Sequence, residues 1–213
     1  MTGSAPPPAA LPGENWQLHT QLPHLEATAE FARALAAHLD PGDLLVLTGG
    51  LGAGKTTFTR ELAHALGVRG QVSSPTFTLS RIHPHEDPAT ADLVHVDAYR
   101  TDAAGIESLD LLATLRTSIT VVEWGRGLVE QSLLGASGSW LDLELNQGTA
   151  SPGQAGSEPA AHEEPRGGAP VIQTDFSETE EELLGVPRRA VLRGYGPRWM
   201  TTPTLPRGFN EHH

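Results

Sequence analysis

The sequence of 213 residues contains no cysteine and no long apolar run. Without cysteine, disulfide bonds, thiol catalysis and cysteine-ligated metal sites are excluded. No stretch approaches the roughly 20 apolar residues that a membrane-spanning helix needs, so no interaction with a membrane is expected. The first 13 residues are rich in proline and alanine and lack the basic start and apolar core of a secretory signal. We therefore expect a cytoplasmic protein.

Positive charge is also scarce. Acidic residues outnumber lysine and arginine by 26 to 14, which gives a formal net charge of −12. A protein that binds nucleic acid by itself normally presents a basic face, so a direct nucleic-acid binder is disfavoured, although a partner could bind nucleic acid on its behalf. Lys55 is the only lysine. Because arginine is used at every other Lys/Arg position, the lysine at this one indicates a need for a compact point charge.

That lysine lies in a glycine-rich loop, residues 49–57, which follows an apolar run and precedes a stretch of helical spacing. The loop matches the phosphate-binding pattern G-x-x-x-x-G-K-[ST], in which backbone N–H groups and the lysine contact phosphate and the hydroxyl binds Mg²⁺. The alternative is a glycine-rich turn that happens to precede a lysine, and the strand–loop–helix context disfavours it. We predict a nucleotide-binding protein. The expected loop contacts are Gly52, Ala53, Gly54, Lys55, Thr56 and Thr57.

Short apolar runs alternate with helical patterns, which predicts an α/β fold. The expected architecture is a single P-loop NTPase domain with a mostly parallel central sheet, flanking helices and added antiparallel edge strands. The chain divides into a disordered tail (1–13), the ATPase domain (14–146), an acidic low-complexity insertion (147–187), a last strand that completes the domain (188–200) and a loose tail (201–213). The insertion holds eight acidic residues against the single Arg166, a composition typical of disorder.

Two of the predicted buried strands end in acidic residues, Asp97 and Glu123. Ligands bind outside the carboxyl ends of parallel strands, so both carboxylates should lie at the same edge of the sheet as the glycine-rich loop. A helix cap or turn is the alternative for each acid. We favour a site in which Thr56, Glu123 and Asp97 bind Mg²⁺ or polarise the attacking water.

Three other residues allow two interpretations each. Thr76 follows a Ser-Pro turn and is either a strand-starting hydroxyl or a switch residue that senses the γ-phosphate and its Mg²⁺. Trp124 either packs against the sheet or stacks on the nucleotide or a partner. His95 shares a strand face with Asp97 because side chains alternate along a strand, and we interpret it as a core histidine.

Four segments resemble the TsaE (YjeE-like) family of bacterial tRNA threonylcarbamoyladenosine biosynthesis proteins. Residues 51–57 resemble the family's phosphate loop, 74–79 its S-P-T-[FY]-T-L switch, 95–100 its H-x-D-x-Y-R element and 122–124 its second switch. They occur in family order and cover about residues 20–145. Gly50 stands where the family usually has an acid, and Gly125 replaces a common proline.

The resemblance implies an ATP- and Mg²⁺-dependent ATPase that acts with TsaB and TsaD. Together they place threonylcarbamoyl on the adenosine next to the anticodon of tRNAs that read A-starting codons; TsaD transfers the group, and other subunits hold the tRNA. The resemblance also implies that Lys55 contacts phosphate, that Thr56 and Glu123 bind Mg²⁺, and that Asp97 and Thr76 are catalytic or switch residues. Thr28 corresponds to a family threonine near the adenine.

Two other functions remain open. A small-molecule kinase would need an acceptor pocket and a basic lid, whereas the one sizeable insertion here is acidic. A nucleotide-sensing scaffold without catalysis is disfavoured by the presence of both Asp97 and Glu123. Arg100 and Arg126 are the nearest arginines by sequence that could stabilise charge on the γ-phosphate. An enzyme without a well-placed arginine is expected to turn over slowly until a partner supplies one.

Overall fold

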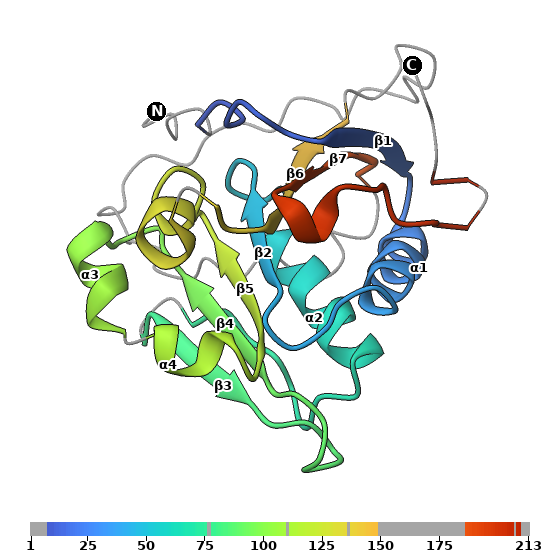
Figure 1. Cartoon of the computed structure of the whole chain (residues 1–213). Helices are drawn as coiled ribbons and strands as arrows, with labels where there is room; N and C mark the ends of the chain where they lie inside the picture. The colour runs from blue at the N-terminus through green and yellow to red at the C-terminus, as the bar shows by residue number, and fades with distance from the viewer. Residues whose placement is uncertain are drawn as a thin grey trace, which may run out of the picture.

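The computed structural model describes residues 8–75, 78–109, 111–135, 137–148, 186–206 and 208–209. Strands and helices alternate along much of this part of the chain (Figure 1). The strands are β1 (Trp16–Leu22), β2 (Leu44–Thr48), β3 (Ser80–His83), β4 (Leu93–Asp97), β5 (Ile119–Glu123), β6 (Trp140–Gln147) and β7 (Arg188–Tyr195). The α-helices are α1 (Leu25–Ala36), α2 (Lys55–Ala65), α3 (Ala103–Ser108) and α4 (Leu111–Leu115), with a π-helical turn (Glu130–Leu134) and a 3₁₀ turn (Pro197–Trp199).

The described strands form one sheet of seven in the order β1-β7-β6-β2-β5-β4-β3. The four central strands, β6, β2, β5 and β4, are parallel to one another. Antiparallel strands complete both edges, because β7 pairs with β6, β1 with β7 and β3 with β4. This arrangement confirms the predicted α/β fold with a mostly parallel centre and antiparallel edge strands.

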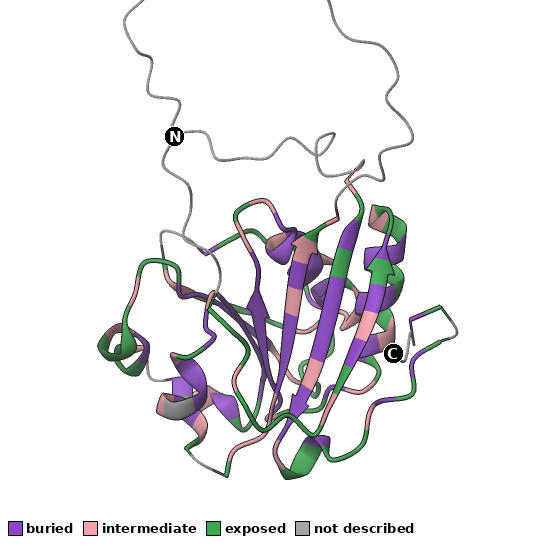
Figure 2. Ribbon diagram, turned by 90° about the horizontal axis from the view of Figure 1, so that it is seen from above, coloured by how far each residue is buried: buried purple, intermediate pink, exposed green. Residues whose placement is uncertain are grey.

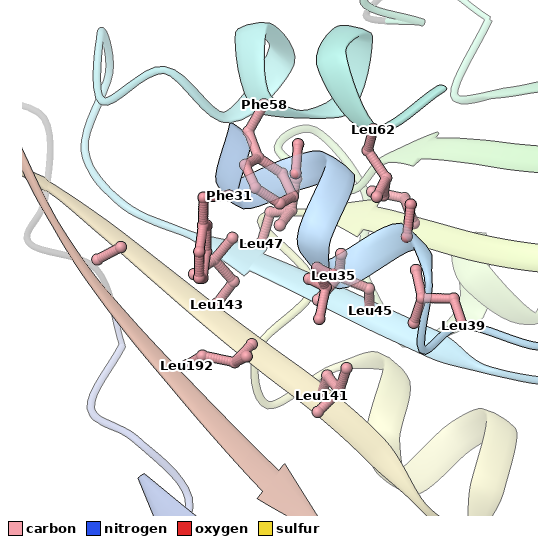
Figure 3. Close-up of a cluster of buried hydrophobic side chains, with 14 of the residues drawn as sticks. Phe31, Leu35, Leu39, Leu45, Leu47, Phe58, Leu62, Leu141, Leu143 and Leu192 are labelled. Atoms are coloured by element: carbon pink, nitrogen blue, oxygen red, sulfur yellow. The ribbon is translucent and has the colours of Figure 1, made fainter. Parts of the chain in front are cut away.

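Helices cover both faces of the sheet, so β2, β4 and β5 are buried along their whole length (Figures 1 and 2). Side chains alternate between the two faces. On β2, Leu45 and Leu47 pack in the core beneath α1 and α2 (Figure 3), whereas Leu44 and Val46 pack in the core beneath α3 and α4. Double burial explains why these strands are short continuous apolar runs in the sequence.

Helix α2 begins directly at the glycine-rich loop. Its N-cap residue is Gly54, which has a left-handed backbone (φ 92°) and supplies no side-chain hydrogen bond to the helix. By contrast, α1 is capped by His24, whose side chain accepts a hydrogen bond from the N–H of Ala27. The first N–H groups of α2 therefore face the loop without a side-chain acceptor from the cap, the arrangement that suits an anion.

The prediction of a loose tail from residue 201 is wrong for the part that contains Leu205 and Phe209. Leu205 and Phe209 are 4% and 7% exposed and belong to the core on the α1–α2 face. The ring of Phe209 lies 5.4 Å from that of Phe31 on α1. Composition suggested a loose segment because two isolated apolar residues show no periodicity, and only the fold reveals the surface that buries them.

The amino-terminal tail also differs from the prediction of disorder up to residue 13. The carbonyl of Pro8 accepts a hydrogen bond from Arg126, and that of Leu11 accepts one from the hydroxyl of Tyr195. Backbone carbonyls make both contacts, so the side-chain composition gave no sign of them. Residues 1–7 and 210–213, and most of the predicted acidic insertion (149–185), lie outside the described part of the chain.

After the Ser-Pro turn, strand β3 starts at Ser80. Thr76 and Phe77 lie outside the described residues. Within the described ranges, every helix is too short or too polar to cross a lipid bilayer.

The packing of the terminal segment can be tested by replacing Phe209 with alanine. Because its ring is buried against Phe31, we expect Phe209→Ala to lower the free energy of unfolding by about 3 kcal/mol, as measured by chemical denaturation. Met200→Ala is the control, since Met200 is 67% exposed and its loss should change stability by less than about 0.5 kcal/mol. Equal stability of the two variants would contradict the packing.

Candidate functional site

The glycine-rich loop joins β2 to α2 at the carboxyl edge of the parallel strands. Gly49, Gly52 and Gly54 all have positive φ angles (151°, 76° and 92°), which other residues adopt only with strain. Space is limited as well: a Cβ atom on Gly54 would lie 2.7 Å from Nε of Arg188. The loop conformation therefore favours glycine at all three positions, two of which, Gly49 and Gly54, are fixed in the sequence pattern.

Lys55 is held inside this loop. Its side chain is 5% exposed, and Nζ donates hydrogen bonds to the carbonyls of Gly49 (3.0 Å) and Gly50 (2.8 Å). Nζ also lies 3.7 Å from the ring centroid of Trp124, a cation–π contact. These groups are neutral dipoles and a π face, so an anion arriving at the loop would bind the ammonium group more strongly than they do.

Glu123 connects the end of β5 to the start of α2. Its Oε2 accepts a hydrogen bond from the hydroxyl of Thr56 (3.0 Å), and its Oε1 lies 2.8 Å from Nε2 of His95. The side chain is 3% exposed. The structure thus brings Thr56 and Glu123 together, although they are 67 residues apart in sequence.

Asp97 lies beside Glu123 because the two residues are partners in the parallel register of β4 and β5. Its Oδ1 accepts a hydrogen bond from the backbone N–H of Tyr99 (3.0 Å), and its Oδ2 accepts one from the hydroxyl of Ser74 (3.3 Å). Asp97 therefore holds the segment before Thr76 against the same edge of the sheet. The two predicted acids do reach one edge, as the parallel-strand argument required.

Two residues near this edge have a strained backbone. Leu79 (φ 61°) and Trp124 (φ 62°) are the only non-glycine residues with positive φ in the described part of the chain. Such a conformation costs on the order of 1–3 kcal/mol and persists where surrounding contacts impose it. Leu79 accepts a hydrogen bond at its carbonyl from the N–H of Asp97, and the N–H of Trp124 donates to the carbonyl of Leu47. The ring of Trp124 also packs on Tyr99, with 4.9 Å between centroids.

The structure brings most of the predicted residues together. Lys55, Thr56, Glu123, Asp97 and Trp124 meet around the loop. The other predicted loop positions are Gly52, Ala53, Gly54 and Thr57.

The predicted role of Thr28 near an adenine stays a prediction. Its buried hydroxyl lies 3.5 Å from the carbonyl of His24, one turn earlier at the start of α1. Thr76 lies outside the described residues, so its switch role also stays a prediction.

Sequence reasoning missed Arg188, the first residue of β7. It is 3% exposed, and its Nε donates a hydrogen bond to the carbonyl of Ala53 in the glycine-rich loop (3.1 Å). The contact joins residues 135 positions apart, and the only signal in the sequence is an arginine at the start of a predicted strand. Arg188 holds that carbonyl from the side of β7.

Arg126, one of the two arginines considered for the γ-phosphate, has a different role. The residue is 4% exposed, and its guanidinium donates to Asp142 (3.1 and 2.7 Å) and to Glu144 (2.9 Å). Arg193 donates to the same two carboxylates. Burial lowers the pKa of Arg126, but the bonds and charges of Asp142 and Glu144 outweigh burial and raise it overall. Arg126 therefore attaches the loop that follows β5 to strand β6. Because its guanidinium is already paired with two carboxylates, we discard it as the arginine that stabilises charge on the γ-phosphate.

The oxygen atoms at this edge suit one kind of metal ion. The described residues contain no group of three or more histidine or acidic side chains arranged to hold a metal. Thr56 and Glu123 instead offer two adjacent oxygens, with Asp97 next to them. Mg²⁺ is usually bound by one or two protein oxygens, with water and substrate phosphates as its remaining ligands. The residues present fit that ion.

These features define a single-domain α/β protein whose polar site lies at the carboxyl edge of its parallel strands. The family model described as "Threonylcarbamoyl adenosine biosynthesis protein TsaE" matches residues 22–152. The chain belongs to the TsaE family.

Curated relatives carry the name tRNA threonylcarbamoyladenosine biosynthesis protein TsaE. The protein from Streptomyces coelicolor is 53% identical over 104 residues, which is 48% of this chain and 70% of the relative. That from Bacillus subtilis is 40% identical over 116 residues, 54% of this chain and 71% of the relative. The crystal structure of Bacillus subtilis YdiB shares the fold, with a TM-score of 0.54 and 24% identity over 85% of this chain and 87% of that one.

The contact between Arg188 and Ala53 can be tested without any ligand. In Arg188→Gln the carbonyl of Ala53 loses a charged donor, a bond worth about 1.5–3 kcal/mol. We expect the amide protons of the loop to exchange with solvent about tenfold faster or more, as measured by hydrogen exchange and mass spectrometry. Arg189→Gln is the matched control because Arg189 is exposed. Unchanged exchange in Arg188→Gln would show that this contact does not hold the loop.

Proposed function

We propose that this protein binds ATP with Mg²⁺ at the carboxyl edge of its sheet and hydrolyses it as a subunit of the machinery that makes threonylcarbamoyladenosine in tRNA. The contact between Thr56 and Glu123 carries the proposal. It places a hydroxyl and a carboxylate beside a loop of phosphate-binding pattern whose lysine is folded inward. The relatives' names supply the pathway.

Each group at the edge has a task in such a reaction. The backbone N–H groups of the loop and the ammonium of Lys55 bind the phosphates, replacing the contacts that Lys55 makes with two carbonyls and Trp124. Thr56 and Glu123 would hold the metal, and Asp97, the register partner of Glu123, would bind the metal's water or orient the attacking water. When bound, Mg²⁺ neutralises charge that develops on the phosphate oxygens.

We expect slow hydrolysis by the isolated protein because of the positions and contacts of three of its arginines. Arg126 is engaged in the pairs with Asp142 and Glu144, and Arg188 donates to the backbone of the loop. Arg100 is exposed after β4. We propose that TsaB and TsaD order this edge or supply a cation, and that they hold the tRNA, since this chain has a net charge of −12.

The role of Glu123 is tested by replacing it with glutamine, which keeps the shape of the side chain and removes its charge. We expect Glu123→Gln to fold and to bind ATP, while the hydrolysis rate falls about 10²-fold or more, the scale for a positioned catalytic group. Glu107→Gln on the exposed side of α3 is the control. The measurement is phosphate release at saturating ATP. Unchanged hydrolysis by Glu123→Gln would mean that Glu123 is only a strand-end acid.

The partner interaction is tested by comparing ATP hydrolysis with and without TsaB and TsaD. We expect stimulation of at least tenfold, since ordering of such a site gives about 10³–10⁵ in the best cases. Tyr99, 55% exposed beside Trp124, should lie at the contact, so Tyr99→Ala should lower the ratio of stimulated to basal rate. Leu112→Ala is the control, because Leu112 is equally exposed (58%) on α4. Fast basal turnover that neither TsaB nor TsaD changes would refute the proposal and favour a self-sufficient enzyme.

A further inference from the structure

His95 occupies a core position without being an ordinary core residue. It lies in the middle of β4 with 0% exposure, next to Leu93 and Val121 of the apolar core on the α1–α2 face. An apolar side chain would satisfy the packing there, and a buried imidazole costs free energy unless it is hydrogen-bonded. One ring nitrogen, Nε2, has a partner, which is Oε1 of Glu123 at 2.8 Å. The other, Nδ1, has none among the described residues.

This contact leaves Glu123 held at both carboxylate oxygens. Because a carboxylate oxygen accepts, Nε2–H of His95 donates to Oε1, while the hydroxyl of Thr56 donates to Oε2. The two donors come from different elements, β4 and α2. A carboxylate with a single donor can rotate about its terminal bond, whereas two donors fix its plane. The direction of Oε2 toward Thr56 thus depends on His95.

We propose that His95 is a positioning residue for the hydrolysis: it fixes the carboxylate of Glu123 so that Oε2 faces Thr56 and the metal site. This inference rests on the proposed ATPase function. It changes the interpretation of His95 from a core histidine to a group that acts through Glu123. Groups that orient a metal-binding carboxylate in this way typically contribute about 10–100-fold in metal affinity or activity.

The chain offers a matched control in His83 on β3. Its ring lies 6.2 Å from that of His95, it is 5% exposed, and its Nε2 has no hydrogen-bond partner in the described residues. His83 therefore shares the burial and the surroundings of His95 without its bond to Glu123. Replacement of either ring by leucine removes a buried imidazole, but only one replacement removes a contact to Glu123.

The experiment compares His95→Leu, His95→Gln and His83→Leu with the wild type. We expect His95→Leu to lower kcat about 10–100-fold and to raise the Mg²⁺ concentration for half-saturation, with the affinity for ATP within about twofold of wild type. The amide nitrogen of glutamine can approach the position of Nε2, so His95→Gln should recover most of the rate. His83→Leu should behave as wild type. Melting temperatures establish that each variant is folded.

A spectroscopic readout covers the case in which His95→Leu does not fold. In ¹⁵N-histidine-labelled wild type, the Nε2–H of His95 should give a proton signal protected from exchange, and Glu123→Ala should abolish that protection. Absence of the protected signal from wild type would overturn the inference. So would unchanged kcat and Mg²⁺ dependence in a folded His95→Leu, which would leave the proposed ATPase intact. No hydrolysis by wild type, alone or with its partners, would instead refute the proposed function and the role of His95 with it.

Discussion

The central strand β2 pairs in parallel with β5 on one side and β6 on the other, and this pairing fixes where the polar groups of the molecule meet. In register, Leu47 of β2 lies opposite Glu123, Glu123 lies opposite Asp97, and Thr48 lies opposite Glu144. All these strands therefore end at the edge where the glycine-rich loop begins. The loop itself needs positive φ angles and close approach to β7, so glycine and Arg188 act together there. A shift of one residue in any of these pairings would move each acid to the opposite face of the sheet.

Because side chains alternate between the two faces of the sheet, the buried polar residues form two separate groups, one on each face, with different roles. Glu123 points to the face of α2, where it meets Thr56 and His95. Asp142 and Glu144 point to the opposite face, where they bind Arg126 and Arg193, and Thr48 also reaches Asp142. Moving Arg126 away from Asp142 and Glu144 would leave buried charges uncompensated, which is costly. These ion pairs therefore hold the loop after β5 in place. The strained Trp124 is the residue that joins β5 to this loop, between the two polar groups.

The sequence was sufficient for features that depend on local pattern. Continuous apolar runs predicted β2, β4 and β5, the glycine spacing predicted the loop, and strand-end acids predicted the edge at which Asp97 and Glu123 meet. It was insufficient where a contact joins distant segments and leaves no periodic mark. Arg188 on Ala53, Phe209 on Phe31 and His95 on Glu123 are contacts of this kind. The pairing of Arg126 with Asp142 is a further contact of this kind, because the position of Arg126 in the sequence does not show that its side chain turns to β6.

The proposed function requires above all that the loop around Lys55 bind the phosphates of Mg²⁺-bound ATP. Isothermal titration calorimetry of the full chain with ATP, with Mg²⁺ and again with the metal chelated, tests it most directly. We expect one binding event per chain that weakens when Mg²⁺ is removed. We also expect Lys55→Ala to weaken binding about 10–100-fold, because a charged hydrogen-bond donor is lost, while Arg189→Ala leaves binding unchanged. No heat of binding with wild type, or equal affinity in Lys55→Ala, would contradict it.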